Sequence, residues 1–317
     1  MLSTRKLELE IIGQLTKQAG RRLWSHELAQ ISIQLFQQQC AQGAPNALAQ
    51  ILLRLALKAC PYAPNAAEIL SAYKTITRQR ADCEMPILAE WMAQLEANSL
   101  PLPIIISCEK YLDKARRAAD ELTNHYFGIR PIIVTGGMDF EFEDNCGQIL
   151  RLPVSDVYEA LPYKVFETWA FFEALGVRHG VIKIDDDLQI NQNAALDIER
   201  VRSAFAAADY MGIALSSPHH DRAWHQGKCA SPVAPVYGKP FLAPWARGAL
   251  YYLSKSALEQ LTSHYLRFPG CLDGELYEDK AVGDVLYTLG IRAVNEPLER
   301  ILQISTDAPE RGLNAAE

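Results

Sequence analysis

Apolar residues recur at helical spacing through the first part of the chain. From about residue 4 to residue 98 the sequence is rich in Ala, Leu and Gln, with an apolar stripe at Leu48, Ile51, Leu52, Leu55 and Ala56. Spacings of three and four residues place such side chains on one face of a helix. Gly, Pro, Asn and Asp clusters interrupt the stretch at residues 20, 43–46, 61–65 and 82–86. These breaks predict about five helices, which we expect to form a small bundle.

The pattern changes after NSLPLP at residues 98–103, where short β-branched runs begin to alternate with helical stretches. Strands are predicted at residues 104–107, 131–135 and 180–184, and helices at residues 110–126 and 160–175. Such alternation is typical of a mostly parallel sheet covered by helices, with ligands at the carboxyl ends of the strands. We therefore expect an α/β domain over residues 99–317, preceded by a small all-α domain over residues 1–98.

Composition and charge narrow the classes of function. The chain has 317 residues, is 49% hydrophobic and carries a formal net charge of -7, so we expect a sizeable core and no nucleic-acid partner. The cysteines number 7 and include no C-x-x-C pair, which favours reduced thiols over a disulfide framework. No window reaches the roughly 18 apolar residues of a membrane span. These features predict a soluble, cytoplasmic protein without a transmembrane segment.

Three consecutive aspartates follow the predicted strand at residues 180–184. In GVIKIDDDLQIN, Asp185, Asp186 and Asp187 come directly after the apolar run. Strand alternation would send Asp185 and Asp187 to the same side of the sheet. Hard divalent cations such as Mn²⁺ and Mg²⁺ prefer oxygen ligands, and they often bind protein carboxylates and substrate phosphates at the same time. The triplet is therefore either a metal site for a diphosphate group or a solvated acidic turn.

A second acidic pair, Glu278 and Asp279, begins a predicted amphipathic helix over roughly residues 278–289. Carboxylates at a helix N-terminus are stabilised by the helix dipole, which is the structural interpretation. The functional interpretation is a general base, since a carboxylate can remove the proton of an attacking hydroxyl. The residues by themselves leave both interpretations open.

Four sequence blocks occur in order between residues 104 and 291. The first is SDVYEALPYK at residues 155–164, similar to D-x-Y-x-x-L-x-x-K, and the second is K-x-D-D-D at residues 183–187. The third, residues 244–254, is similar to P-x-x-x-G-x-x-Y-x-x-S, with Trp245 at an aromatic position. The fourth is E-D-x-x-x-G at residues 278–283. Together the blocks resemble glycosyltransferase family 31, which includes β-1,3-galactosyl- and N-acetylglucosaminyltransferases.

This resemblance implies a GT-A type nucleotide-sugar fold, a UDP-sugar donor, a Mn²⁺ (or Mg²⁺) ion held by the D-x-D motif, and inversion to a β-linked product. By position, Asp187 would be the direct metal ligand, Asp185 a supporting group near the metal or the donor ribose, and Asp186 part of the donor site. Asp279 would be the catalytic base, with Glu278 beside it as an orienting or acceptor-binding group.

Four further residues are candidates for donor binding. Lys164 offers a cation near the diphosphate or the acidic triplet, and Ser107 ends the first strand, where the nucleotide would lie. Gly248 would let the backbone approach a ligand closely, and Trp245 would stack on a sugar face. Each also has a structural interpretation, as a solvated helix charge, a turn residue or a core residue.

Two features depart from the family pattern. The family often supplies a histidine metal ligand after the fourth block, but the last histidine here is His264. The segment SSPHHDRAWHQGK at residues 216–228 contains His219, His220 and His225, whose spacing fits no common zinc pattern, so we expect an acceptor-side loop there. The lack of a membrane anchor favours a bacterial enzyme in the cytoplasm or at the inner membrane face, acting on a glycan or glycolipid acceptor.

Other classes of function stay open at this point. One is a GT-A transferase of another family with a different donor. A second is a non-catalytic adaptor that binds a glycan or nucleotide, with residues 1–98 forming a homo-oligomer or recruiting a protein partner. A phosphohydrolase is a third, although the chain has neither an evident nucleophile motif nor a phosphate-cradling glycine loop.

Overall fold

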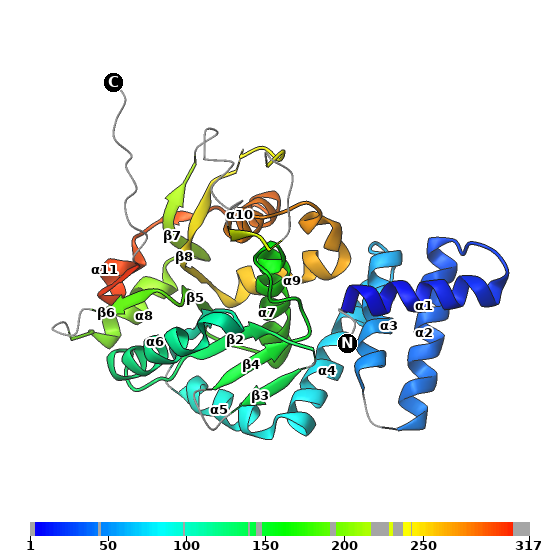
Figure 1. Ribbon diagram of the computed structural model, residues 1–317, viewed down its shortest axis with the longest axis horizontal. Coiled ribbons are helices and arrows are strands. Elements are labelled where there is room, and N and C mark those ends of the chain that lie inside the picture. The colour runs from blue at the N-terminus through cyan, green and yellow to red at the C-terminus, as the bar shows by residue number, and fades with distance from the viewer. Residues whose placement is uncertain are drawn as a thin grey trace.

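The chain begins with helices and continues as a sheet covered by helices. The computed structural model describes residues 4–43, 46–97, 99–138, 140–143, 148–190, 195–216, 228–230, 237–241 and 243–306. The N-terminal helices are α1 (Thr4–Ala19), α2 (Ser25–Gln42), α3 (Ala47–Ala59), α4 (Ala66–Glu84) and α5 (Pro86–Ala97). Figure 1 shows α1 and α2 at one side of the molecule, away from the sheet, whereas α4 and α5 lie toward it.

The remaining elements form the sheet and its cover. The strands of the 8-stranded sheet are β1 (Leu102–Ile106), β2 (Ile132–Gly136), β3 (Glu141–Glu143), β4 (Ile149–Leu152), β5 (Val181–Asp185), β7 (Tyr210–Leu215), β8 (Trp245–Leu253) and β9 (Val294–Asn295). A second, 2-stranded sheet pairs β6 (Leu188–Ile190) with β10 (Ile304–Thr306). The helices are η1 (Glu109–Tyr111), α6 (Leu112–His125), η2 (Tyr158–Ala160), α7 (Leu161–Leu175), α8 (Ile198–Ala206), α9 (Lys255–Arg267), η4 (Pro269–Leu272), α10 (Glu278–Thr288) and α11 (Leu298–Leu302).

The order of the strands brings distant segments to one edge of the sheet. The order is β3-β4-β2-β1-β5-β8-β7-β9, and the run from β4 to β5 is parallel. Strand β8 lies antiparallel between β5 and β7, with Lys183 opposite Tyr251. Because β8 runs the other way, its first residues lie beside the carboxyl end of β5. The acidic triplet and the start of β8 therefore meet at the edge where ligands of α/β proteins bind.

The central strands are buried on both faces, which explains their continuous apolar sequences. Every residue of β1 and β2 is buried, as expected for parallel strands covered by helices on both sides. Helix α7 is buried along most of its length and contributes Phe166, Trp169 and Phe172 to the core. This packing holds η2, at the start of α7, in a defined position near the carboxyl ends of the strands.

Helices α3 and α4 share their apolar core with the sheet. Leu57 and Ile69 belong to the same cluster of buried side chains as residues of β1 and β5. Arg54 on α3 also forms an ion pair of 2.6 Å with Glu167 on α7, and the Tyr265 hydroxyl donates to the same carboxylate at 2.6 Å. The N-terminal helices are thus joined to the α/β part by apolar and ionic contacts. A domain boundary at residue 98 stays a prediction.

The structure confirms the α/β class and most predicted elements. The predicted strands correspond to β1, β2 and β5, and the predicted helices to α6 and α7. The described part of residues 4–97 forms the five helices that the breaks in periodicity indicated. Among the described helices, none has the length and apolar character needed to cross a bilayer.

Candidate active site

Lys183 lies at the centre of the carboxylates that the sequence singled out. It belongs to β5, two residues before Asp185, so both side chains leave the strand on the same side. Its ammonium bonds to Asp185, to the backbone carbonyl of Gly248 and, at 3.1 Å, to Oε1 of Glu278. The Lys183 side chain is only 1% exposed. One buried cation therefore joins β5, β8 and α10.

Asp279 accepts hydrogen bonds from two backbone N–H groups, one of them that of Gly248. The backbone N–H of Gly248 donates to Oδ2 of Asp279 at 2.9 Å, and the N–H of Lys280 donates to Oδ1 at 2.7 Å. Glu278 and Asp279 lie in the first turn of α10, as predicted. The two interpretations of this acidic pair do not exclude one another. The carboxylates begin the helix, where the dipole stabilises them, and they also face β8.

The absence of a side chain at position 248 allows this approach. A Cβ on Gly248 would lie 2.6 Å from Oε1 of Glu278 and 3.2 Å from Oδ2 of Asp279. Both distances are shorter than ordinary carbon–oxygen contacts. A side chain at position 248 would therefore displace the carboxylates that pass over the backbone of β8.

The pKa values of two carboxyl groups are raised by their surroundings. Loss of hydration raises the pKa of Asp279 to about 7, and repulsion by Glu278 adds to the effect. Displacement of water, together with repulsion by Glu278 and Asp187, raises the pKa of Asp185 to about 6 despite the attraction of Lys183. Burial, with repulsion between neighbouring carboxylates, therefore favours the protonated forms of both groups. A carboxyl group with a pKa near neutrality can accept a proton during a reaction.

Tyr158 faces the same group of carboxylates from η2. Burial raises the pKa of its hydroxyl, and the charges of Glu278, Asp185 and Asp279 raise it further. The Lys228 ammonium lies over the Tyr158 ring, 5.4 Å from its centroid. Tyr158 was part of the first sequence block but had no predicted role. Tyr158 is thus a residue of the first sequence block that lies close to the carboxylates of the candidate site.

Ser107 and Asp186 meet at the carboxyl ends of β1 and β5. The Ser107 hydroxyl donates to Oδ2 of Asp186 at 2.6 Å, and the ammonium of Lys114 lies 3.4 Å from Oδ1. The two strands are parallel neighbours, with Ile106 opposite Asp185. The structure thus brings together two of the predicted donor-binding residues and adds Lys114, which the sequence did not single out.

Lys164 is a buried link within the protein. Its ammonium donates to the carbonyl of Ser107 at 2.8 Å and lies 2.5 Å from Oδ1 of Asp156. Asp156 also accepts from the backbone N–H groups of Gly136 at 2.8 Å and Glu109 at 2.6 Å. The ion pair of Lys164 and Asp156 therefore fixes the loops after β1 and β2. Lys164 reaches the predicted donor site through Ser107, and its direct contact with a diphosphate stays a prediction.

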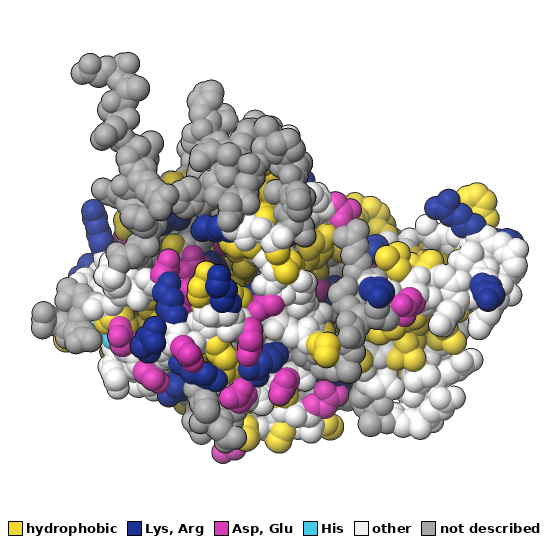
Figure 2. All heavy atoms as spheres, in the orientation of Figure 1, with side chains coloured by type: hydrophobic (Ala, Val, Ile, Leu, Met, Phe, Trp, Pro, Cys, Tyr) yellow, Lys and Arg dark blue, Asp and Glu magenta, His cyan; other side chains and the backbone are white. Residues whose placement is uncertain are grey.

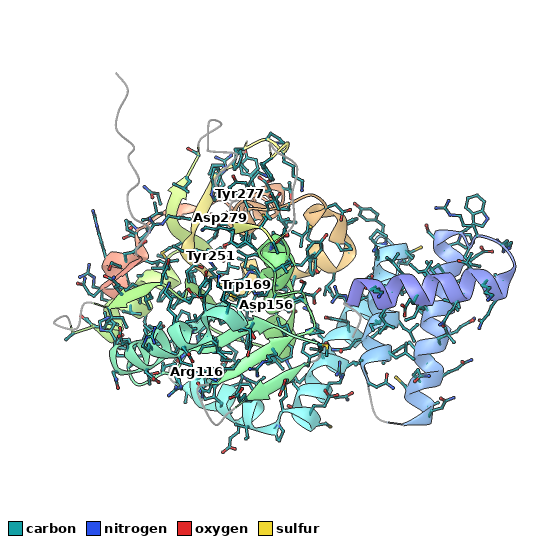
Figure 3. All side chains as sticks on the ribbon, viewed as in Figure 1. Arg116, Asp156, Trp169, Tyr251, Tyr277 and Asp279 are labelled. Carbon is teal, nitrogen blue, oxygen red and sulfur yellow. The ribbon has the colours of Figure 1, made fainter. Side chains whose placement is uncertain are left out.

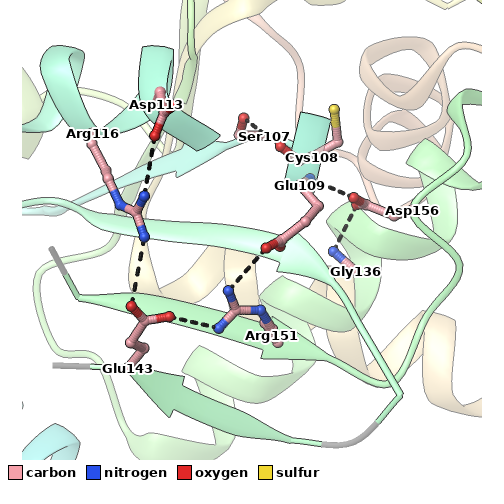
Figure 4. Close-up of polar contacts among 9 residues, drawn as sticks. All are labelled: Ser107, Cys108, Glu109, Asp113, Arg116, Gly136, Glu143, Arg151 and Asp156. Carbon is pink, nitrogen blue, oxygen red and sulfur yellow. Dashed lines mark hydrogen bonds and ion pairs between the residues drawn. The ribbon is translucent and has the colours of Figure 1, made fainter. Parts of the chain in front are cut away.

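A chain of ion pairs borders this region, as Figure 4 shows. Arg151 on β4 contacts Glu109 at 3.1 Å and Glu143 at 3.0 Å, and Arg116 on α6 contacts Glu143 at 3.6 Å. Figure 2 shows basic and acidic side chains interspersed over this face of the molecule. Partly exposed ion pairs of this kind contribute little stability individually. Their effect here is to connect η1 and α6 to strands β3 and β4.

Trp245 is a core residue in this structure. It is 1% exposed and packs in an aromatic cluster with Phe241, Tyr237 and Tyr277. A Cβ on Gly283 would lie 2.4 Å from Cβ of Trp245, so the glycine of the E-D-x-x-x-G block makes room for the Trp. The predicted stacking of Trp245 on a sugar has no exposed ring face here. Figure 3 shows Tyr277 and Asp279 in the same part of the molecule, above Tyr251 and Trp169.

The acidic turn is where the sequence predicts a cation site. Asp187 lies in the turn between β5 and β6, so the turn decides its direction and strand alternation does not. Burial raises the pKa of Asp185, and repulsion by Glu278 and Asp187 adds to the effect; a divalent cation would neutralise charge of this kind. In the described part of the chain, no three His, Cys, Asp or Glu side chains form a ready-made ligand group. His219, His220 and His225 lie outside the described residues.

A cavity of about 540 Å³ lies elsewhere, where α4 and α5 meet the end of α7 and the start of α9. Its lining includes Arg78, Glu173 and Gly176. Because α7 separates this cavity from η2, it does not include the carboxylates described above. The geometry of those carboxylates, and not the cavity, defines the candidate site.

Comparison with known proteins adds no assignment. No protein-family model and no curated protein sequence matches this chain. The candidate site is therefore defined by its own chemistry: two acidic segments, a buried lysine between them, and a carboxyl group with a pKa near neutrality at the ligand-binding edge of an α/β sheet.

Proposed function

We propose that this chain is an inverting glycosyltransferase of GT-A type. It would move a hexose or N-acetylhexosamine from a UDP-sugar to a hydroxyl of a glycan or glycolipid, forming a β-linkage. One observation carries the proposal: Lys183 and Gly248 join the acidic end of β5 to the acidic start of α10 in one hydrogen-bonded network. Two separate carboxylate functions, one for a leaving diphosphate and one for an attacking hydroxyl, are what such a transfer needs.

Asp279 is the base in this proposal. The acceptor oxygen attacks the anomeric carbon, the bond between that carbon and the diphosphate oxygen breaks, and UDP leaves with the bonding electrons. The proton of the acceptor hydroxyl passes to the Asp279 carboxylate. A pKa of about 7 lets Asp279 be deprotonated before the transfer and hold the proton afterwards. The N–H of Gly248 keeps Oδ2 in place, which leaves the Asp279 carboxylate with a defined direction.

Asp185 and Asp187 would hold a Mn²⁺ or Mg²⁺ ion. The bound cation would neutralise charge on the departing diphosphate. Asp186 and Ser107, which bond to one another at the end of β1, would border the donor nucleotide. Lys114 supplies a cation beside them, 3.4 Å from Asp186. We place the enzyme in the cytoplasm or at the inner membrane face, with the N-terminal helices available for self-association or for a partner.

The test is UDP release from a panel of UDP-sugars in the presence of Mn²⁺. We expect one donor to be turned over selectively, and Asp187→Ala and Asp279→Asn to abolish the turnover. Asp113→Asn is a matched control, because Asp113 is also a first-turn helix carboxylate but its side chain is 87% exposed and pairs with Arg116 on the same helix. If neither turnover nor a rise in melting temperature with UDP and Mn²⁺ is seen, the transferase proposal is wrong. Binding of UDP without turnover would instead support the adaptor.

A further inference from the structure

Lys183 has a bonding pattern that the steps above do not use. An ammonium carries three hydrogen-bond donors, and Lys183 directs bonds to Asp185, to the Gly248 carbonyl and to Glu278. The three partners come from β5, β8 and α10. Its ammonium also lies over the ring of Tyr251, 6.0 Å from the ring centroid. The position of this cation is thus defined from four directions.

We propose that Lys183 is a positioning residue that sets the donor-side carboxylate Asp185 and the base Asp279 in one geometry. The inference rests on the proposed function and assigns Lys183 no contact with substrate. Lys183 acts on Asp185 directly. It acts on Asp279 through Glu278, the preceding residue in α10, and through the backbone of Gly248, whose carbonyl accepts from Lys183 and whose N–H donates to Asp279.

Stability alone does not explain a lysine at this place. A buried ion pair contributes little net stability compared with a well-packed apolar pair, because desolvation offsets the attraction. Val181, which leaves β5 on the same side as Lys183, is fully buried, so this face of the strand accommodates apolar side chains. What an apolar residue cannot do is bind a carbonyl and two carboxylates at once. Lys183 therefore restricts the distance between the two acidic segments.

Glu278 has little freedom to move, because its carboxylate lies close to the backbone of Gly248. Glu278 lies so near the β8 backbone that a Cβ at position 248 would be 2.6 Å from Oε1. The Glu278 side chain is 7% exposed, so it has little room to move once the lysine holds it. A displacement of about 1 Å at a reacting group can lower a rate by about 100-fold. The position of Asp279 is thus sensitive to the loss of Lys183.

The experiment compares Lys183→Met, Glu278→Gln and the double variant with the wild-type chain. We expect Lys183→Met to lower kcat by about 100-fold, while the Kd for UDP with Mn²⁺, measured by calorimetry, changes less than about fivefold. The double variant also removes the Glu278 charge that Lys183→Met leaves without a partner, so it should melt at a higher temperature than Lys183→Met. Its kcat should nevertheless stay at least about 10-fold below that of Glu278→Gln, because Asp185 and the Gly248 carbonyl lack their donor.

A second lysine provides the control. Lys74 also bridges two carboxylates, Glu173 at 2.6 Å and Glu259 at 3.6 Å, but lies at the other end of α7. Lys74→Met should lower the melting temperature and leave kcat unchanged. If the double variant matches Glu278→Gln in kcat, or if UDP affinity falls in step with kcat/KM, the positioning role of Lys183 is refuted and the transferase stands. An inactive wild-type chain would refute both.

Discussion

Gly248 donates its backbone N–H to Asp279 at 2.9 Å, and its α-carbon faces the carboxylates of Asp279 and Glu278 so closely that no side chain fits between them. Through the same peptide segment, the Gly248 carbonyl accepts a hydrogen bond from Lys183. A single residue of β8 thus contacts both acidic segments of the candidate site.

Gly248→Ala should therefore impair both folding and activity. The added methyl would lie 2.6 Å from Oε1 of Glu278, and relief of such overpacking typically costs about 1–3 kcal/mol. We expect a lower unfolding midpoint in urea and a loss of UDP release of about 100-fold. Gly13→Ala is the control, because a Cβ there has no atom within 4 Å; in helix α1 this change should stabilise by up to about 1 kcal/mol. Equal activity of the two variants would contradict the assigned contact.

The reaction should depend on pH through Asp279. Loss of hydration and the charge of Glu278 raise the pKa of Asp279 to about 7, and a general base works only when deprotonated. We expect kcat/KM to rise tenfold per pH unit below about 7 and to level off above it. The same raised pKa means that the folded state binds this proton more tightly than the unfolded state, so stability falls as pH rises through about 7. A flat rate profile between about pH 5.5 and 8.5 would count against Asp279 as the base.

Loss of the Asp156 carboxylate should weaken donor binding. Asp156 accepts from Gly136, Glu109 and Lys164, and Lys164 is 2% exposed. Asp156→Asn leaves a buried ammonium without its counter-charge, a change that typically costs about 3–5 kcal/mol. We expect a lower melting temperature and a raised KM for the donor, since Ser107 depends on Lys164. A donor KM equal to that of the wild type would contradict the link between Lys164 and the donor site.

Replacement of Arg54 should destabilise the contact between the N-terminal helices and the α/β part. Burial would raise the pKa of Glu167, but the charge of Arg54 outweighs it and lowers the pKa. This stabilisation is present above the unfolded pKa of about 4.3 and is lost as pH falls through the folded value. Arg54→Met should cost about 3–5 kcal/mol at pH 7 in urea unfolding. Adding Glu167→Gln should recover part of the loss, and a double variant less stable than Arg54→Met would contradict the pairing.

The sequence determined the local structure of this protein because periodicity and breaks are local properties. Helices α1 to α5 follow from apolar spacing and from the Gly, Pro and Asn clusters between them, and β1, β2 and β5 follow from β-branched runs. It also marked Asp185 and Asp279, since carboxylates after an apolar strand and at a helix start are visible in the chain itself. The resemblance to a family added roles, which stay proposals.

Only the tertiary structure decided what these residues contact. Lys183 was visible as a charge within an apolar strand, but its bonds to Glu278 and Gly248 join positions 95 and 65 residues apart in the chain. Likewise, the aromatic Trp245 turned out to be buried against Gly283. Strand order, and above all the antiparallel placement of β8 beside β5, creates these contacts. Pairing between strands depends on the packing of the whole chain, which no local pattern contains.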